Sequence, residues 1–165
     1  MAQQIINNGE IGLTVRNKIN QNFTELYDLA KTLYVGTQSV AIHNIDVDTT
    51  WQTLDQIDTE VYSSKISQAN GIYSFISDGG YDVRYNVIGR WDNSEEVELA
   101  LFKNGVQVGN PRIVTGFGGS KDITIHGDFF SQFLSTDTIE FKMRMTTGTA
   151  RIDFIHSDIN INRIF

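Results

Sequence analysis

Histidines are the first residues with which this chain could do chemistry. The three of them, His43, His126 and His156, lie far apart, each within a strand-like run. Zinc and similar metals are usually held by ligands at short, regular spacings such as His-x₃-His, and none of these spacings occurs. The sequence therefore predicts half-buried strand histidines, no transition-metal site and no other cofactor.

Carboxylates are the second group that could do chemistry. Asp46-x-Asp48 and Asp55-x-x-Asp58-x-Glu60 offer oxygen ligands of the kind that calcium prefers, but they lack the pattern of an EF-hand loop. Solvated acidic loops are the simpler interpretation, and a bound calcium ion stays open. A glycosidase needs two carboxylates facing each other across a cleft, and no pair stands out.

Nucleophilic serines and phosphate-binding loops are the third kind of feature that could do chemistry. No Gly-x-Ser-x-Gly elbow is present. The Gly-rich stretch 116–121 lacks the Walker spacing and precedes no helical pattern, so it is interpreted as a loop between strands. The sequence therefore predicts a protein that is not an enzyme.

Composition excludes several classes of partner. The 165-residue chain carries 13 basic and 20 acidic residues, a formal net charge of −7, and has no cysteine. An acidic chain is poorly suited to displace counterions from nucleic acid or to bind anionic lipid. No apolar run approaches the ~20 residues that cross a bilayer, and no signal peptide is visible. We expect synthesis in a cytoplasm, without membrane insertion or nucleic-acid binding.

The N-terminal region carries a helical pattern. Apolar residues from Val15 to Tyr34 recur at spacings of three and four, and Gly36 is expected to end the helix. A helix this short is marginal alone, so it needs its own copies, the following domain or another protein as a partner. Asn22 in the apolar row would cost stability but fix register and oligomer number. The predicted attachment and trimerisation residues are Val15, Ile19, Asn22, Phe23, Leu26, Leu29 and Leu33.

Beyond the helix the pattern changes to period two. Residues 81–91 alternate over a long stretch, and Asn104-Gly105 is a strong signal for a two-residue hairpin. About eight to ten short strands, each with one buried face, predict an antiparallel sandwich or barrel. The predicted fold is therefore mainly β, with an N-terminal arm and a single α-helix before the β-domain.

Part of the helix resembles a known signature. The segment Lys18-Ile-Asn-Gln-Asn-Phe-Thr-Glu-Leu-Tyr27, preceded by a Gly-rich arm and Arg16, is similar to a motif near the N-termini of many tailed-phage virion proteins. The resemblance implies a virion structural protein. Residues 1–13 and the helix would then hold the chain to a capsid or adaptor protein. The motif is common to head fibres and tail fibres and so does not distinguish between these two kinds of protein.

The C-terminal region resembles the jelly rolls of the C1q and tumour-necrosis-factor type. The matching segments are Asn70–Phe75, Val97–Gly105, Phe133–Ile139 and Ile159–Phe165, with Thr136 replacing the glycine that those families commonly carry before Asp137. The resemblance implies a jelly-roll β-sandwich that forms a homotrimer. We therefore expect an arm and trimerising helix over residues 1–36 and a jelly-roll knob over residues 37–165.

Three functions compete on these grounds. A capsid decoration or head-fibre trimer is favoured over a short tail fibre or receptor-binding tip, because a ~30 Å helix keeps the knob close to its attachment point. The third competing function is that of an enzyme or a small-molecule lectin. Trp51, in a polar stretch, is the candidate for an exposed aromatic residue that contacts a host glycan, whereas Tyr81 and Trp91 share a core face. Tyr85, Phe141 and Phe165 are expected either in the core or at the trimer interface.

Overall fold

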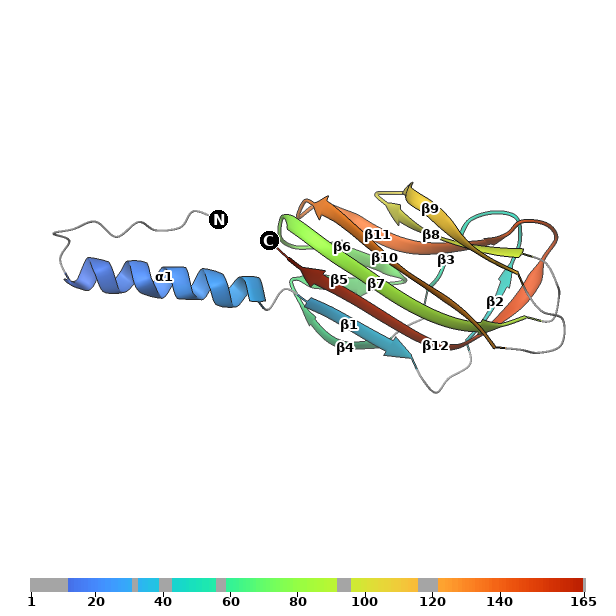
Figure 1. Ribbon diagram of the computed structural model, residues 1–165, viewed down its shortest axis with the longest axis horizontal. Coiled ribbons are helices and arrows are strands. Elements are labelled where there is room, and N and C mark those ends of the chain that lie inside the picture. The colour runs from blue at the N-terminus through green and yellow to red at the C-terminus, as the bar shows by residue number, and fades with distance from the viewer. Residues whose placement is uncertain are drawn as a thin grey trace.

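Two antiparallel sheets packed face to face, with a single helix at one end, make up the described chain (Figure 1). The computed structural model describes residues 12–30, 33–38, 43–55, 59–91, 96–115 and 122–164. Long alternating segments become long strands, because period two places every second side chain on the buried face. The predicted antiparallel sandwich is confirmed.

Each sheet contains six strands. The first sheet has the order β10 (Asp122–Phe133), β7 (Gly79–Arg90), β12 (Ala150–Arg163), β1 (Leu33–Gln38) and β4 (Thr59–Ser64), with β2 (His43–Val47) also paired to β12. The second sheet has the order β5 (Ile66–Ala69), β6 (Ile72–Phe75), β11 (Thr138–Met145), β8 (Glu96–Lys103) and β9 (Val106–Thr115), with β3 (Gln52–Thr53) paired to β11.

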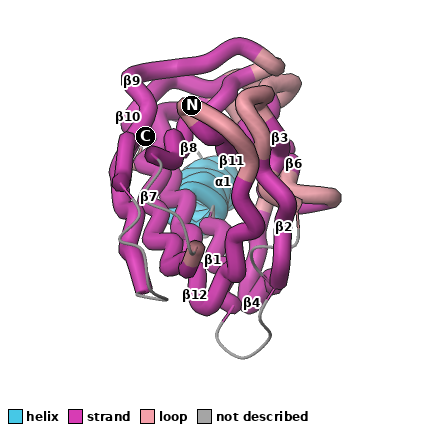
Figure 2. Tube along the Cα trace, turned by 90° about the vertical axis from the view of Figure 1, so that its right-hand side faces the viewer, coloured by secondary structure: helices cyan, strands magenta, loops and turns pink. Residues whose placement is uncertain are grey.

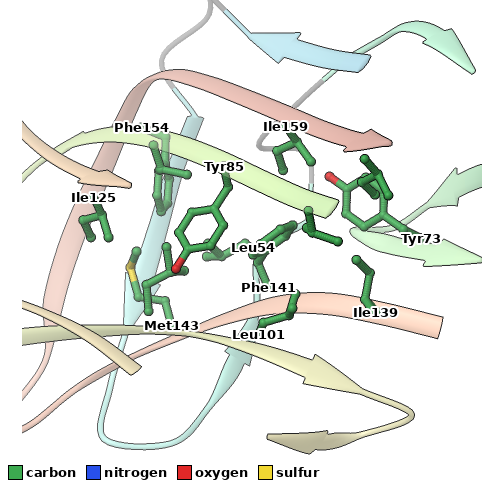
Figure 3. Packing of buried hydrophobic residues seen from close by; sticks show 14 of the residues in the cluster. Leu54, Tyr73, Tyr85, Leu101, Ile125, Ile139, Phe141, Met143, Phe154 and Ile159 are labelled. Atoms are coloured by element: carbon green, nitrogen blue, oxygen red, sulfur yellow. The ribbon is translucent and has the colours of Figure 1, made fainter. Parts of the chain in front are cut away.

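Aromatic side chains share the space between the sheets with aliphatic side chains and methionines (Figure 3). The Phe75 and Phe133 rings stack with centroids 4.4 Å apart, and Tyr81 lies edge-on to Phe75 at 4.6 Å. Tyr81 and Trp91 are 0% and 2% exposed, which confirms the core face predicted for both residues.

Tyr85 and Phe141 also belong to this core. Their rings meet from opposite sheets, with centroids 5.0 Å apart. Both residues are more than nine-tenths buried within one copy of the chain. The sequence leaves the core and the trimer interface open for these two residues, and the structure places both in the core. Phe165 lies outside the described residues.

The helix is shorter than the sequence pattern indicates. Helix α1 spans Gly12–Ala30, so the prediction of a helix that continues to Tyr34 and ends at Gly36 is wrong. Leu33 lies in β1, and the expected boundary after residue 36 falls inside this strand. The reason is burial: Tyr34 is fully buried and edge-on to Tyr73 at 5.0 Å, while β1 pairs with both β12 and β4. A core contact flanked by two ladders outweighs local helix propensity.

Helix α1 projects away from the sandwich along the long axis of the molecule (Figure 1). It leaves from the end where β1 begins and β12 ends, and the view down this axis shows it behind the sandwich (Figure 2). The rise of an α-helix, about 1.5 Å per residue, gives α1 a length of about 28 Å. No helix in the described part of the chain is long and apolar enough to cross a membrane.

Two turns in the described part of the chain place an asparagine and a glycine side by side at positive φ angles. The predicted Asn104-Gly105 hairpin is confirmed between β8 and β9, with φ angles of 51° and 76°. Gly71, in the turn between β5 and β6, has a φ of 75°. A Cβ atom at Gly71 would also overlap the Leu54 carbonyl group, whereas one at Gly105 would meet no atom within 4 Å.

Gly71→Ala is therefore expected to lower the free energy of unfolding by at least about 2 kcal/mol, because backbone strain and a clash combine. Gly105→Ala, which carries only the strain, should lower it by about 1 kcal/mol. Urea unfolding followed by tryptophan fluorescence measures both values. Equal losses would contradict the role assigned to the Leu54 contact.

Candidate attachment and ligand-contact surfaces

The described apolar side chains of α1 face outward. Phe23 is 67% exposed, Leu26 59% and Ile19 38%. Together with the half-buried Val15 and Asn22 they form the helix stripe, the described part of the predicted attachment surface. The side chain of Leu29 lies outside the described residues. Since α1 projects from the sandwich, the described residues of the sandwich do not cover this stripe, as they would cover an ordinary surface helix.

Trp51 lies on the outer face of the second sheet. It is half-buried, with its ring edge-on to Phe102 at 5.3 Å. The Arg144 guanidinium carbon lies 4.4 Å from the Trp51 ring centroid, and Arg144 Nε is 2.6 Å from Glu98 Oε2. One aromatic face is thus engaged in a cation–π contact, which a stacking sugar would have to displace. The glycan-contact role of Trp51 stays a prediction.

Charges around Trp51 form neutralising pairs. Lys142 Nζ lies 3.0 Å from Glu140 Oε1 and 4.9 Å from the Phe102 ring centroid. Thr53 Oγ1 donates a hydrogen bond of 2.8 Å to Glu140 Oε2. These side chains lie on β3, β8 and β11, which are far apart in sequence. For this reason sequence patterns did not reveal them.

The histidines and acidic segments do not converge. His126 is exposed on the outer face of β10, contrary to the half-buried placement expected for it. His156 is half-buried, as expected, with Nε2 2.7 Å from Asp158 Oδ2. Asp48 accepts a 2.7 Å hydrogen bond from the Thr50 amide. Among the described residues no group of three or more metal-ligating side chains is close enough to hold an ion.

Several residues named as candidates from the sequence lie outside the described residues. The side chain of His43 is one of these. The same holds for the calcium candidate Asp58 and the side chain of Glu60, for the Gly-rich stretch 116–121, and for residues 1–11 of the predicted arm.

Asp137 is a buried carboxyl group held by several donors. Its Oδ1 accepts a hydrogen bond from the Asn104 side chain at 2.7 Å, and Oδ2 accepts one from the Leu134 amide at 2.8 Å and lies 2.8 Å from Lys103 Nζ. Burial raises the pKa of Asp137, but the hydrogen bonds from Leu134, Lys103 and Asn104 outweigh it and lower the pKa to about 2. The group ties the β8–β9 hairpin to the β10–β11 turn.

Comparisons with known proteins reveal the fold but not a family. No protein-family model matches the chain, and no curated protein matches it. The globular domain of zebrafish complement 1qA is 12% identical, with a TM-score of 0.57 over 82% of this chain and 98% of that one. Eiger TNF from S. frugiperda is 9% identical, with a TM-score of 0.56 over 81% and 94%.

A third solved structure, the PRD1 vertex protein P5, is 11% identical, with a TM-score of 0.52 over 81% of this chain and 73% of that one. At these identities the likeness concerns the fold alone. The chain folds as a jelly-roll β-sandwich with an N-terminal helix, as its sequence predicts, and this sandwich is similar in fold to C1q and TNF domains.

Asp137→Asn should destabilise the protein by about 1–3 kcal/mol at pH 7, because the ion pair with Lys103 is lost from a buried site. The folded-state pKa lies below the ordinary value of 3.8. The stabilisation by the carboxylate is therefore present above that value and lost as the pH falls toward 2. Urea unfolding between pH 7 and pH 2 should show the stability curves of the wild type and the D137N variant converging. A gap that stays constant with pH would contradict this assignment.

Proposed function

We propose that the chain is a homotrimeric structural protein of a tailed-phage virion, without enzymatic activity, that decorates the capsid or forms a head fibre. The phage-type motif of Lys18–Tyr27, the exposed helix stripe and the jelly-roll fold support this proposal together. The likeness of the fold to a PRD1 vertex protein adds support from a virion protein of the same architecture.

The observation that carries the proposal is the exposed helix stripe. A 19-residue helix is marginal in water without tertiary packing, so α1 needs a partner. Burying each large apolar side chain of the stripe would contribute about 1.5–3 kcal/mol. We assign this partner to further copies of the chain, because Val15 and Asn22 occupy one heptad row and Ile19 and Leu26 the other.

The placement of the helix suits parallel association. Because α1 continues the long axis of the sandwich, several copies can bring their helices together while their sandwiches lie side by side at one end (Figure 1). Asn22, half-buried within the stripe, would select register and oligomer number. The resemblance to C1q and TNF domains implies that this number is three.

The length of the helix favours the head over the tail. A shaft of about 28 Å holds the sandwich close to whatever binds residues 1–13, which suits decoration of a large surface. The alternative is a short tail fibre or receptor-binding tip that recognises a host glycan or protein. In that case Trp51 is the candidate contact.

Light scattering coupled to size exclusion should give a mass three times the 18.6 kDa of one chain. The double variant Phe23→Ser/Leu26→Ser should shift the protein toward a monomer, because the helix stripe loses its apolar contacts. Val106→Ser, at a side chain that is 67% exposed in the β8–β9 hairpin, is the matched control.

Asn22→Leu should change the oligomer size or the cooperativity of assembly. Trimers unaltered in both properties would exclude the register role of Asn22.

Cryo-electron microscopy of the virion that carries this chain tests its location. We expect trimers at local three-fold positions of the head, with residues 1–13 bound to capsid subunits. Density confined to the tail tip or baseplate would contradict the decoration role and establish the receptor-binding alternative. Absence of the chain from the particle would refute both.

A further inference from the structure

A pocket opens where the two sheets meet at their β9 and β10 edges. Its volume is about 250 Å³, and side chains from β7, β8, β9 and β10 line it. We call it the edge pocket. None of the residues singled out from the sequence as attachment or glycan-contact residues lines it.

The β9 strand bulges at this pocket. Leu99 pairs with Arg112 and Leu101 with Val108, so residues 109–111 together stand opposite Ala100 alone. Gly109 takes a φ of 71°, which glycine adopts without steric cost. Bulges of this kind re-aim side chains, and they are common beside binding sites. Here the bulge places Asn110 and Arg112 on the pocket wall.

Tyr85 reaches the pocket through space left by a glycine. Gly127 pairs with Tyr85 across β10 and β7, and a Cβ atom there would overlap the phenol, 2.6 Å from Cζ. The absence of a side chain at Gly127 lets the buried ring extend toward the edge. Burial raises the pKa of Tyr85 more than the hydrogen bond with Arg112 lowers it. The hydroxyl therefore stays protonated and can both donate and accept.

Arg112 and Asp128 face each other at the pocket mouth. Arg112 Nη2 lies 3.9 Å from Asp128 Oδ1, beyond hydrogen-bond distance, and the two side chains are 53% and 80% exposed. An exposed pair at this separation contributes little to stability. Leu101, Val108 and Phe129 supply the apolar side chains of the lining.

We propose that the edge pocket binds one uncharged sugar ring of a glycan. Sugar hydroxyls would donate to Asp128, accept from Arg112 and pair with Tyr85 and Asn110, while the C–H face packs on Phe129. One positive and one negative charge cancel, which suits a neutral ligand. At about 250 Å³ the pocket is slightly smaller than typical small-molecule sites, which begin at about 300 Å³, and so suits a single ring at most. The proposal is independent of where the chain sits on a virion.

Saturation-transfer NMR on the full chain tests the proposal. The probes are the methyl glycosides of glucose, galactose, mannose and N-acetylglucosamine. We expect at least one to bind, and Arg112→Ala and Asp128→Ala each to weaken it about tenfold or more, as lost charged hydrogen bonds do. Arg151→Ala removes an exposed arginine beside Asp153 on the first sheet, and neither residue lines the pocket, so this control should leave binding unchanged. Gly127→Ala should weaken binding by displacing Tyr85.

Three outcomes would overturn the proposal. The first is that none of the four probes binds. The second is that Trp51→Ala abolishes binding while Arg112→Ala preserves it, which would move the site to the second sheet. The third is that Arg112→Ala and Asp128→Ala lower the oligomeric mass in light scattering, which would make the pocket a contact between copies. Because mass and sugar binding are separate readouts, failure of this proposal is distinguishable from failure of the trimer.

Discussion

Burial of aromatic rings between the two sheets is the constraint on which the rest of the structure depends. Phe75 stacks on Phe133, and Tyr85 meets Phe141, so side chains from both sheets share one dry layer. Tyr34 enters the same layer, and β1 is therefore recruited into the first sheet. This recruitment ends the helix at Ala30 and directs α1 away from the sandwich. The exposed helix stripe is thus a consequence of core packing.

The two proposed functions arise where this packing is incomplete. At the helix, an apolar stripe lacks cover from its own domain, and association of copies would supply it. At the edge pocket, the β9 bulge lies beside the β10 edge of the other sheet, and Tyr85 extends from the core to a polar mouth. The first site is apolar and extended, which suits protein contacts. The second is small, concave and mixed in polarity, which suits a small polyol.

Features that depend on neighbouring residues can be predicted from the sequence, whereas contacts between residues distant in the chain cannot. Strand alternation in residues 81–91 and the Asn104-Gly105 turn were predicted correctly, since each depends on neighbouring residues. The sequence pattern extends the helix too far because Leu33 and Tyr34 continue its spacing. The core contact of Tyr34 and the pairing of β1 with two strands, which decide otherwise, involve residues distant in sequence. The partners of Trp51 and the walls of the edge pocket were missed because several strands contribute them. Asn110-Pro111 and Gly127 were the local signals that could have pointed to the pocket.

By itself the sequence determined the class of fold and the existence of the helix. These follow from side-chain periodicity, turn chemistry and residue order, which are local properties of the chain. Only the tertiary structure decided that Tyr85 and Phe141 are core residues, that Asp137 joins two turns, and that Arg112 faces Asp128. Those outcomes depend on strand register and sheet pairing, which bring together residues that are distant in sequence.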